Sequence, residues 1–236
     1  MIFVTGDKHG AVDYNDLSSD NFPVGKSLTK SDYVIVAGDM GIIWEAERME
    51  REQYLIDWYN SKPWTTLFID GNHENFHRLN RLPTREIFGS VVGVVSDSIF
   101  HLRRGNIYII EDKTFFTFGG AASIDKNRRR EFLTWWKEEI PSYQEMQDGL
   151  INLEKYPEID YIITHTCPSS IFTRLCEIFS YDEILGKTGY EETLREFFEG
   201  LLSMIKFKKW YFGHFHQDAE INDKFTLLYN SVIQIN

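Results

Sequence analysis

Cysteine is scarce in this sequence, and long apolar runs are missing from it. The two cysteines, Cys167 and Cys176, are too few for a disulfide framework in 236 residues, so we expect a reducing, cytoplasmic setting. No apolar run approaches the roughly 20 residues that a membrane-spanning helix needs. We also expect no signal peptide, because strand-like residues begin at once without a charged leader. These absences predict a protein with no membrane partner.

Basic residues are also fewer than acidic ones. The chain has 25 basic and 36 acidic residues, which gives a formal net charge of −11. A binding surface for long nucleic acid needs a basic stripe, so no extended nucleic-acid surface is expected. Anionic substrates remain compatible with this charge, because bound divalent ions would reverse the sign inside a site.

The apolar content is sufficient for a full core. With 42% hydrophobic residues and no visible repeat or linker, we expect one domain over residues 1–236. Residues 121–155 are expected to cover part of it. The pattern is strand–helix at the front, a meander in the middle and strands at the end. It predicts a mixed α/β fold of two packed mixed β-sheets, a β-sandwich flanked by helices. The expected strands are 2–5, 33–37, 65–69, 161–164 and 209–212, with a meander over 91–118 and a closing strand pair over 225–235; the expected helices are 44–59, 74–82 and 190–207.

Five of these strand ends lead into polar clusters with metal-binding side chains. Carboxylate, imidazole and carboxamide groups together suit Mn, Fe, Zn or Ni, while the lack of ligand cysteines disfavours a structural zinc. On extended backbone, residues two apart point the same way, so each Asp-x-His or His-x-His pair can approach one locus. The clusters are Asp7-Lys8-His9, Asp39, Asn72-His73-Glu74, His165 and His214-Phe215-His216.

These candidates outnumber the ligands of one ion. Seven of them would hold two divalent ions if Asp39 bridged the pair: Asp7, His9, Asp39, Asn72, His165, His214 and His216. Paired metals clamp the attacking and leaving oxygens of an in-line displacement at phosphorus, with a bridging hydroxide as nucleophile. His73, beside a ligand and not needed as one, is the natural acid for the leaving group. We expect His77 to be a surface histidine, His101 to be structural and Cys167 to be a small buried thiol.

The five clusters, in this order, resemble the motifs of the calcineurin-like metallophosphoesterases. The resemblance implies a four-layer β-sandwich in which Asp7, His9 and His216 hold the first metal. It further implies that Asn72, His165 and His214 hold the second, that Asp39 bridges them and that His73 assists the leaving group. Residues 119–129, Gly-Gly-Ala-Ala-Ser-Ile-Asp-Lys-Asn-Arg-Arg, are similar to a signature of small bacterial and phage members, which singles out Lys126 and Arg129.

The phosphate-binding arginines of the phosphoprotein-phosphatase branch have no counterpart here. The corresponding stretches read Asp39-Met40-Gly41 and Asp70-Gly71-Asn72. Our hypothesis is that Lys126, Arg128 or Arg129 supplies the missing positive charge, with Asn72 as a further substrate contact. The alternative for Arg128-Arg129-Arg130 is a solvated surface.

The expected function is hydrolysis of phosphomonoesters or phosphodiesters at a dinuclear metal centre, with manganese favoured. A phosphatase acting on a phosphoprotein or a small phosphoester is the first reading. The alternative within enzymes is a nucleotide or cyclic-nucleotide phosphodiesterase. A catalytically silent scaffold is the alternative from another class, and the intact ligand set disfavours it because a scaffold needs no converging metal ligands.

Overall fold

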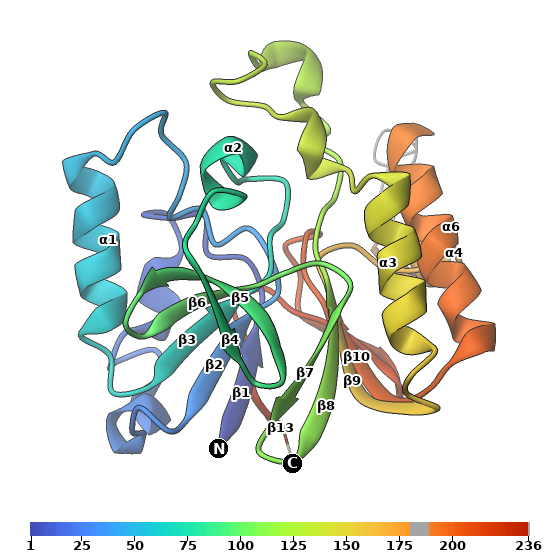
Figure 1. Cartoon of the computed structure of the whole chain (residues 1–236), viewed down its shortest axis with the longest axis horizontal. Helices are drawn as coiled ribbons and strands as arrows, with labels where there is room; N and C mark the ends of the chain where they lie inside the picture. The colour runs from blue at the N-terminus through green and yellow to red at the C-terminus, as the bar shows by residue number, and fades with distance from the viewer. Residues whose placement is uncertain (180–188, 236) are drawn as a thin grey trace.

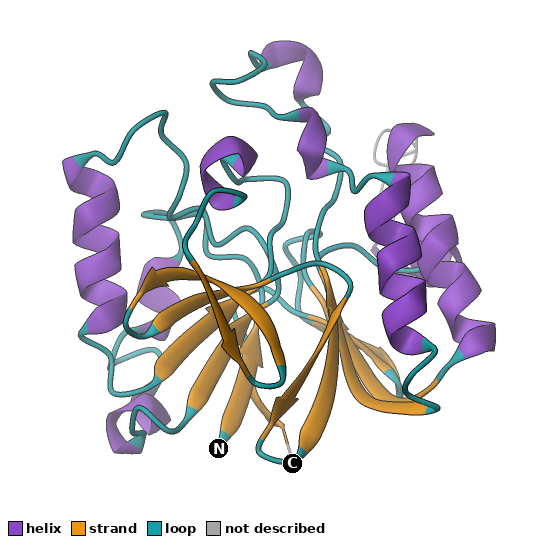
Figure 2. Cartoon of the chain, viewed as in Figure 1, coloured by secondary structure: helices purple, strands orange, loops and turns teal. Residues whose placement is uncertain are grey.

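Two mixed β-sheets pack face to face, and helices lie on both outer faces (Figure 1; Figure 2). The computed structural model describes residues 1–179 and 189–235. The predicted fold class is confirmed: the chain is a helix-flanked sandwich of mixed sheets. Among the described helices, none is both long and apolar enough to cross a membrane.

The first sheet has seven strands, with a parallel centre formed by β1, β2, β3 and β6. In spatial order it contains β13 (Val232–Ile235), β1 (Ile2–Thr5), β2 (Tyr33–Val36), β3 (Thr65–Phe68), β6 (Ile99–Leu102), β5 (Ser90–Ser96) and β4 (Thr84–Ile87). Two helices follow strands of this sheet: α1 (Glu50–Asn60) and the single turn α2 (Phe76–Leu79).

The second sheet has six strands, and β8, β9, β10 and β12 run parallel in it. Its order is β11 (Ala219–Asn222), β12 (Phe225–Leu227), β10 (Lys206–Phe212), β9 (Glu158–Thr164), β8 (Lys113–Phe118) and β7 (Asn106–Ile110). Its outer face is covered by α3 (Tyr143–Leu153), α4 (Ser169–Phe179) and α6 (Gly189–Met204).

Period-two alternation distributes apolar side chains between the layers. In β1, Ile2 and Val4 lie in the core between the sheets, whereas Phe3 joins the core on the side of α1. In the second sheet, Ile163 faces the other sheet and Ile162 faces the helices. Because successive strand residues point to opposite faces, sheets covered on both sides need continuous apolar runs, which these strands have.

Two strand groupings expected from the sequence are wrong. The 91–118 meander is divided: β5 and β6 belong to the first sheet, while β7 and β8 form a hairpin in the second. β6 is already paired on both edges, to β3 and β5, so β7 has no edge to join there. Likewise β12 is flanked by β10 and β11, so β13 pairs with the open edge of β1 rather than with β12.

All three expected helices are shorter than the sequence predicts. α6 ends at Met204 rather than at 207, because Lys206 already begins β10. α1 begins at Glu50 rather than at Trp44, because Asn75 donates side-chain hydrogen bonds to the carbonyls of Trp44 and Glu45 and holds them in a loop. α2 begins after Asn75, which caps it by accepting the N–H of Arg78. The strand β4 and the helix α4 were not predicted.

Candidate metal centre

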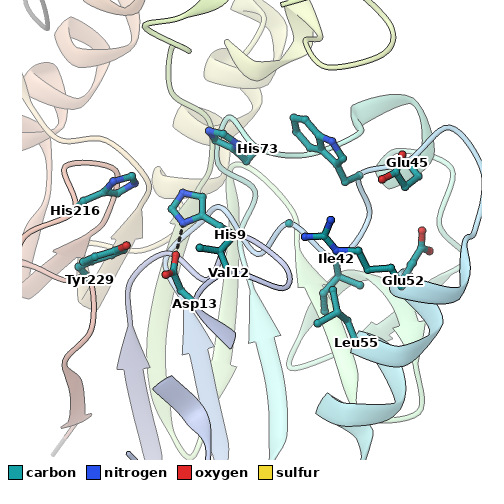
Figure 3. A pocket seen from close by; sticks show the side chains of 13 residues that line it. His9, Val12, Asp13, Ile42, Glu45, Glu52, Leu55, His73, His216 and Tyr229 are labelled. Atoms are coloured by element: carbon teal, nitrogen blue, oxygen red, sulfur yellow. Dashed lines mark hydrogen bonds and ion pairs between the residues drawn. The ribbon is translucent and has the colours of Figure 1, made fainter. Parts of the chain in front are cut away.

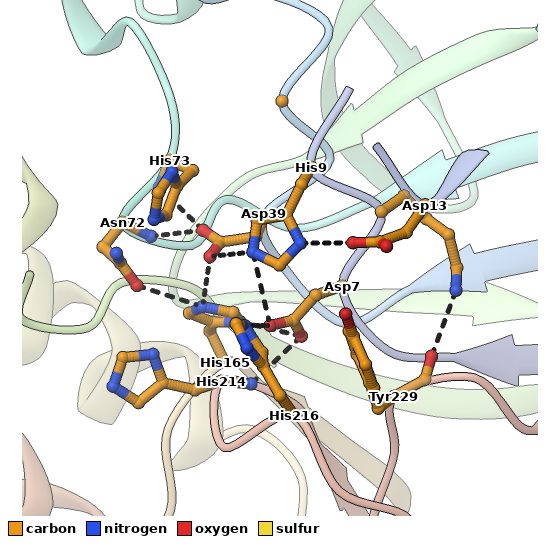
Figure 4. A network of polar contacts seen from close by, with 12 residues as sticks. Asp7, His9, Asp13, Asp39, Asn72, His73, His165, His214, His216 and Tyr229 are labelled. Carbon is orange, nitrogen blue, oxygen red and sulfur yellow. Dashed lines mark hydrogen bonds and ion pairs between the residues drawn. The ribbon is translucent and has the colours of Figure 1, made fainter. Parts of the chain in front are cut away.

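The carboxyl ends of parallel strands from both sheets meet at one place. His165, which follows β9, donates from Nδ1 to the carbonyl of Ala37 at the end of β2, at 2.8 Å. The N–H of Gly213, after β10, donates to the carbonyl of His165 at 3.0 Å. The carboxyl ends of parallel strands are the common location of ligand sites in α/β proteins, and all five polar clusters lie here (Figure 4).

Asp39 is at the centre of this cluster, and its two carboxylate oxygens have different surroundings. Oδ1 accepts the backbone N–H groups of Asn72 and His73, each at 2.7 Å. Oδ2 lies 3.4 Å from Nε2 of His9 and 3.3 Å from Nε2 of His165. One oxygen is therefore fixed by backbone, and the other faces two histidines from different sheets.

Asp7 is fully buried, and among the described residues only one of its oxygens accepts a hydrogen bond. Oδ1 accepts the backbone N–H of His214 at 3.0 Å. Oδ2 has no hydrogen-bond partner of adequate geometry among the described residues, although Nε2 of His216 lies 3.2 Å away. A buried carboxylate oxygen without a partner is costly, and a cation at this point would satisfy it.

Two of the imidazole rings are anchored on the side away from the centre. Nδ1 of His9 donates to Oδ2 of Asp13 at 2.6 Å, as Nδ1 of His165 does to Ala37. Their Nε2 atoms face the aspartates. Histidine ligands in metal sites ordinarily have the second ring nitrogen held in this way.

Asn72 and His214 complete the set of candidate ligands. Oδ1 of Asn72 lies 3.3 Å from Nε2 of His165, and the ring centroids of His165 and His214 are 5.0 Å apart. Nε2 of His214 faces the buried carboxylate of Glu191 at 3.9 Å, which leaves its Nδ1 for the centre.

The loops that carry these residues are not extended, contrary to the reasoning from residue spacing. Left-handed φ angles occur at His9 (41°), Asp39 (46°), His214 (73°) and His216 (50°). Such angles cost about 1–3 kcal/mol each for non-glycine residues and cluster at functional sites. Gly71 permits the tight approach of its loop, because a Cβ there would lie 2.1 Å from Oδ1 of Asp39. Turns, rather than strand geometry, bring the side chains together.

The electrostatics of the cluster favour positive charge at its middle. Burial opposes ionisation of Asp39, but the nearby His165 and His73 rings outweigh it and hold the pKa of this carboxyl well below its usual range. Burial would lower the pKa values of His9 and His165, yet the surrounding carboxylates raise them to about 9 and about 10. The carboxylates that raise the pKa values of His9 and His165 would stabilise a bound cation in the same way.

The donors fit divalent cations. Among the residues that the structure describes, three sets have ligand atoms within 4.8 Å of one another: Asp7, His9 and His216; His9, Asp39 and His73; Asp7, Asp39 and His165. The three sets contain six different residues, more than the four ligands of one tetrahedral ion. Cys167 is buried, and its pKa is raised well above the usual value, chiefly by burial, which does not suit a thiolate ligand.

His73 lies at the exposed side of the centre. Its ring is stacked on Trp44, with centroids 5.6 Å apart, and its Nε2 accepts a hydrogen bond from Nη2 of Arg129 at 3.1 Å. Burial, followed by the charge of neighbouring cationic groups, lowers its pKa despite the opposing field of Asp39. The ring is therefore held in one orientation by aromatic stacking and by Arg129.

Only one of the three cationic candidates reaches the centre. Arg129 is mostly buried and also binds Asp125 through Nε at 2.6 Å. Lys126 lies over the Trp135 ring, 4.2 Å from its centroid, and Arg128 is exposed. His77, 45% exposed, is 3.8 Å from Glu138, and His101 is buried against Asp70.

Two pockets open at the centre and share His73 and His216. One, of about 390 Å³, is lined on its far side by Ile124, Asp125 and Arg129. The other, of about 460 Å³, extends past Trp44 to Leu55 of α1 (Figure 3). A molecule bound at the metal centre can therefore extend in two directions.

Several residues around the site were not identified from the sequence. Asp13 is four residues after His9, a spacing that could have indicated it. Tyr229 follows β12 and stacks on His216 at 4.8 Å. Glu139, Glu191 and the role of Ser123 depend on tertiary contacts and had no local signal.

Comparisons with known proteins identify no family. The sequence matches no protein-family model, and no curated protein matches it. A Staphylococcus aureus structure, provisionally described as a 5′-nucleotidase in complex with alpha-ketoglutarate, is similar with a TM-score of 0.47 and 16% identity. The similarity covers 97% of this chain but 48% of that one, so the present chain spans about half its length. At this TM-score and identity the similarity carries no functional information.

Proposed function

We propose that the protein is a metal-dependent phosphoesterase that hydrolyses phosphoesters at a pair of divalent ions. The observation that carries this proposal is the position of Asp39. Its Oδ2 lies between Nε2 of His9 and Nε2 of His165, at 3.4 and 3.3 Å, while backbone N–H groups hold Oδ1. A carboxylate oxygen so placed suits a ligand shared by two ions.

In this proposal the donors form two sets around Asp39. Asp7, His9 and His216 hold one ion, and Asn72, His165 and His214 hold the other. When bound, such a pair lowers the pKa of water and neutralises charge on the phosphoryl oxygens. Manganese is the ion we favour, with Fe, Zn and Ni as the alternatives.

The chain's own residues bind the phosphoester and protonate the leaving group. Arg129 offers a guanidinium at the edge of the centre, where it would bind a phosphoryl oxygen. A phosphate that binds the guanidinium of Arg129 would break the hydrogen bond between Arg129 and Nε2 of His73. The freed Nε2 of His73 would then take up a proton from water and pass it to the leaving oxygen, with the ring orientation kept by Trp44.

A diester substrate is the second candidate, and the two pockets favour it. A phosphomonoester has one organic group, whereas a diester has two, and the pockets extend from the centre in two directions. A nucleotide diester is one such substrate. Phosphate monoesters, including phosphoprotein, need only one of the pockets.

The test is metal analysis followed by hydrolysis of p-nitrophenyl phosphate and of bis-p-nitrophenyl phosphate with added Mn²⁺. Preference for the first indicates a phosphatase, and preference for the second a diesterase. A protein that binds two ions per chain and hydrolyses neither ester would support the silent scaffold. A protein that binds no divalent ion would contradict the proposal.

A further inference from the structure

A buried carboxylate in residues 121–155, the covering segment, is connected to the candidate metal centre by hydrogen bonds through one serine. Glu139 is fully buried, and Ser123 is 2% exposed. Oε1 of Glu139 accepts the backbone N–H of Ser123 at 3.0 Å, and Oε2 accepts its hydroxyl at 2.6 Å. An ionised carboxylate can only accept, so with Glu139 ionised the hydroxyl hydrogen of Ser123 is committed to Oε2.

The committed hydroxyl determines how the Asn72 amide is oriented. Nδ2 of Asn72 lies 3.3 Å from Oγ of Ser123. A serine hydroxyl has one hydrogen; since Glu139 takes it, Oγ can only accept from Asn72. The NH₂ group of Asn72 must then face Ser123, and Oδ1 must face His165 at 3.3 Å. The hydrogen-bond partners of Ser123 thus determine which end of the Asn72 amide is nitrogen and which is oxygen.

Glu139 is itself tied to the loop that carries Asn72. Arg104 donates from Nη2 to the carbonyl of Glu138 at 2.8 Å and forms an ion pair with Asp70 at 2.6 Å. The backbone N–H of Gly120 donates to the carbonyl of Asp70 at 3.0 Å. The contacts form a closed ring from Asp70 through Arg104 and the covering segment back to Asn72.

We propose that Ser123 and Glu139 are positioning residues that turn the Oδ1 of Asn72 toward a cation and so set the affinity of one of the two ions. This inference rests on the proposed metal centre, and neither residue touches substrate in it. The covering segment thereby supplies Glu139, the carboxylate that orients the ligand Asn72 through Ser123.

Glu139→Gln is the discriminating substitution, because it keeps size and removes charge. A glutamine cannot accept from both the N–H and the hydroxyl of Ser123, so one of the two bonds is lost. Loss of such an outer partner ordinarily weakens metal affinity roughly 10–100-fold. The neighbouring Glu138→Gln makes the same chemical change and is the matched control. Ser123→Ala is the second variant, and circular dichroism of each metal-free variant checks its fold.

Calorimetric titration with Mn²⁺ gives the readout. We expect two binding steps in the wild type and in Glu138→Gln, and one step weakened in Glu139→Gln and Ser123→Ala. Asn72→Asp should make Mn²⁺ affinity insensitive to Glu139→Gln, because a carboxylate presents oxygen in either orientation. A merely structural role of Glu139 would not be relieved in this way.

Two results would overturn the inference. Two unchanged binding steps in folded Glu139→Gln would contradict it while leaving the proposed function intact. A wild-type protein that binds no Mn²⁺ would overturn both. The amide signals of Asn72 in the metal-free protein give an independent check, since they should shift in Glu139→Gln and not in Glu138→Gln.

Discussion

The backbone N–H of Asn72 donates to Oδ1 of Asp39 at 2.7 Å. This contact joins the loop after β3 to the loop after β2 and leaves Oδ2 of Asp39 as the oxygen that faces the histidines. A carboxylate at this position thus organises the loops and completes the proposed ion pair at the same time.

Asp39→Asn should lose at least one ion and reduce turnover to background. An asparagine must present its NH₂ either to backbone N–H groups or to the cations, and both are repulsive. Metal content by mass spectrometry and hydrolysis of the p-nitrophenyl esters measure the effect. Asp20→Asn, at an exposed loop position, is the control. Full activity with two bound ions would refute the bridging role.

His73→Ala should keep both ions and lose rate by roughly a hundredfold to ten-thousandfold, the range typical of a general acid. The loss should be greatest for substrates with poor leaving groups, which need the proton most. His77→Ala is the matched control, since this ring is 45% exposed and lies four residues further on. Loss of a metal ion in His73→Ala would instead make His73 a ligand, in keeping with its proximity to His9 and Asp39.

Arg129→Ala should lower kcat/KM for phosphoesters by roughly tenfold to a hundredfold, the effect expected of a charge-assisted hydrogen bond. Arg128→Ala, one residue earlier and exposed, should change it by less than about twofold. Steady-state kinetics on both esters provide the comparison. Equal effects of the two substitutions would mean that general surface charge, not a phosphate contact, is responsible.

Much of the fold and the candidate site could be predicted because both depend on local patterns. Apolar runs ending in Gly-Asp, Gly-Asn-His or Gly-His mark parallel strands and the loops at their carboxyl ends. Such ends converge in any fold of this class, so Asp39 and His165 could be placed together before their contact was known.

The rest depended on which strand edges were already taken and on distant contacts. Nothing in the residues of β7 indicates that both edges of β6 are occupied. The apolar residue Trp44 fits the start of a helix, but Asn75, thirty-one residues away, holds the carbonyl of Trp44 in a loop. Glu139 resembles an ordinary surface glutamate until its contact with Ser123 is seen.

Metal binding should release protons and strengthen as pH rises. The pKa values of His9 and His165 are raised to about 9 and about 10, so both rings are protonated at neutral pH without metal, and a cation must displace those protons. We expect about two protons released per chain near pH 7. Calorimetry in buffers of different ionisation enthalpy measures this number, and zero release would contradict it.

Asp70→Asn should destabilise the metal-free protein by about 2 kcal/mol at neutral pH. Burial opposes ionisation of Asp70, but Arg104 and then His101 lower its pKa from 3.8 to about 2. Because the folded-state pKa is lower, the stabilisation is complete above 3.8 and disappears as pH falls toward about 2. Urea unfolding across this range should show wild type and variant converging as the pH falls. A difference that stays constant to the acid limit would mean that packing, not the charge of Asp70, is what the substitution removes.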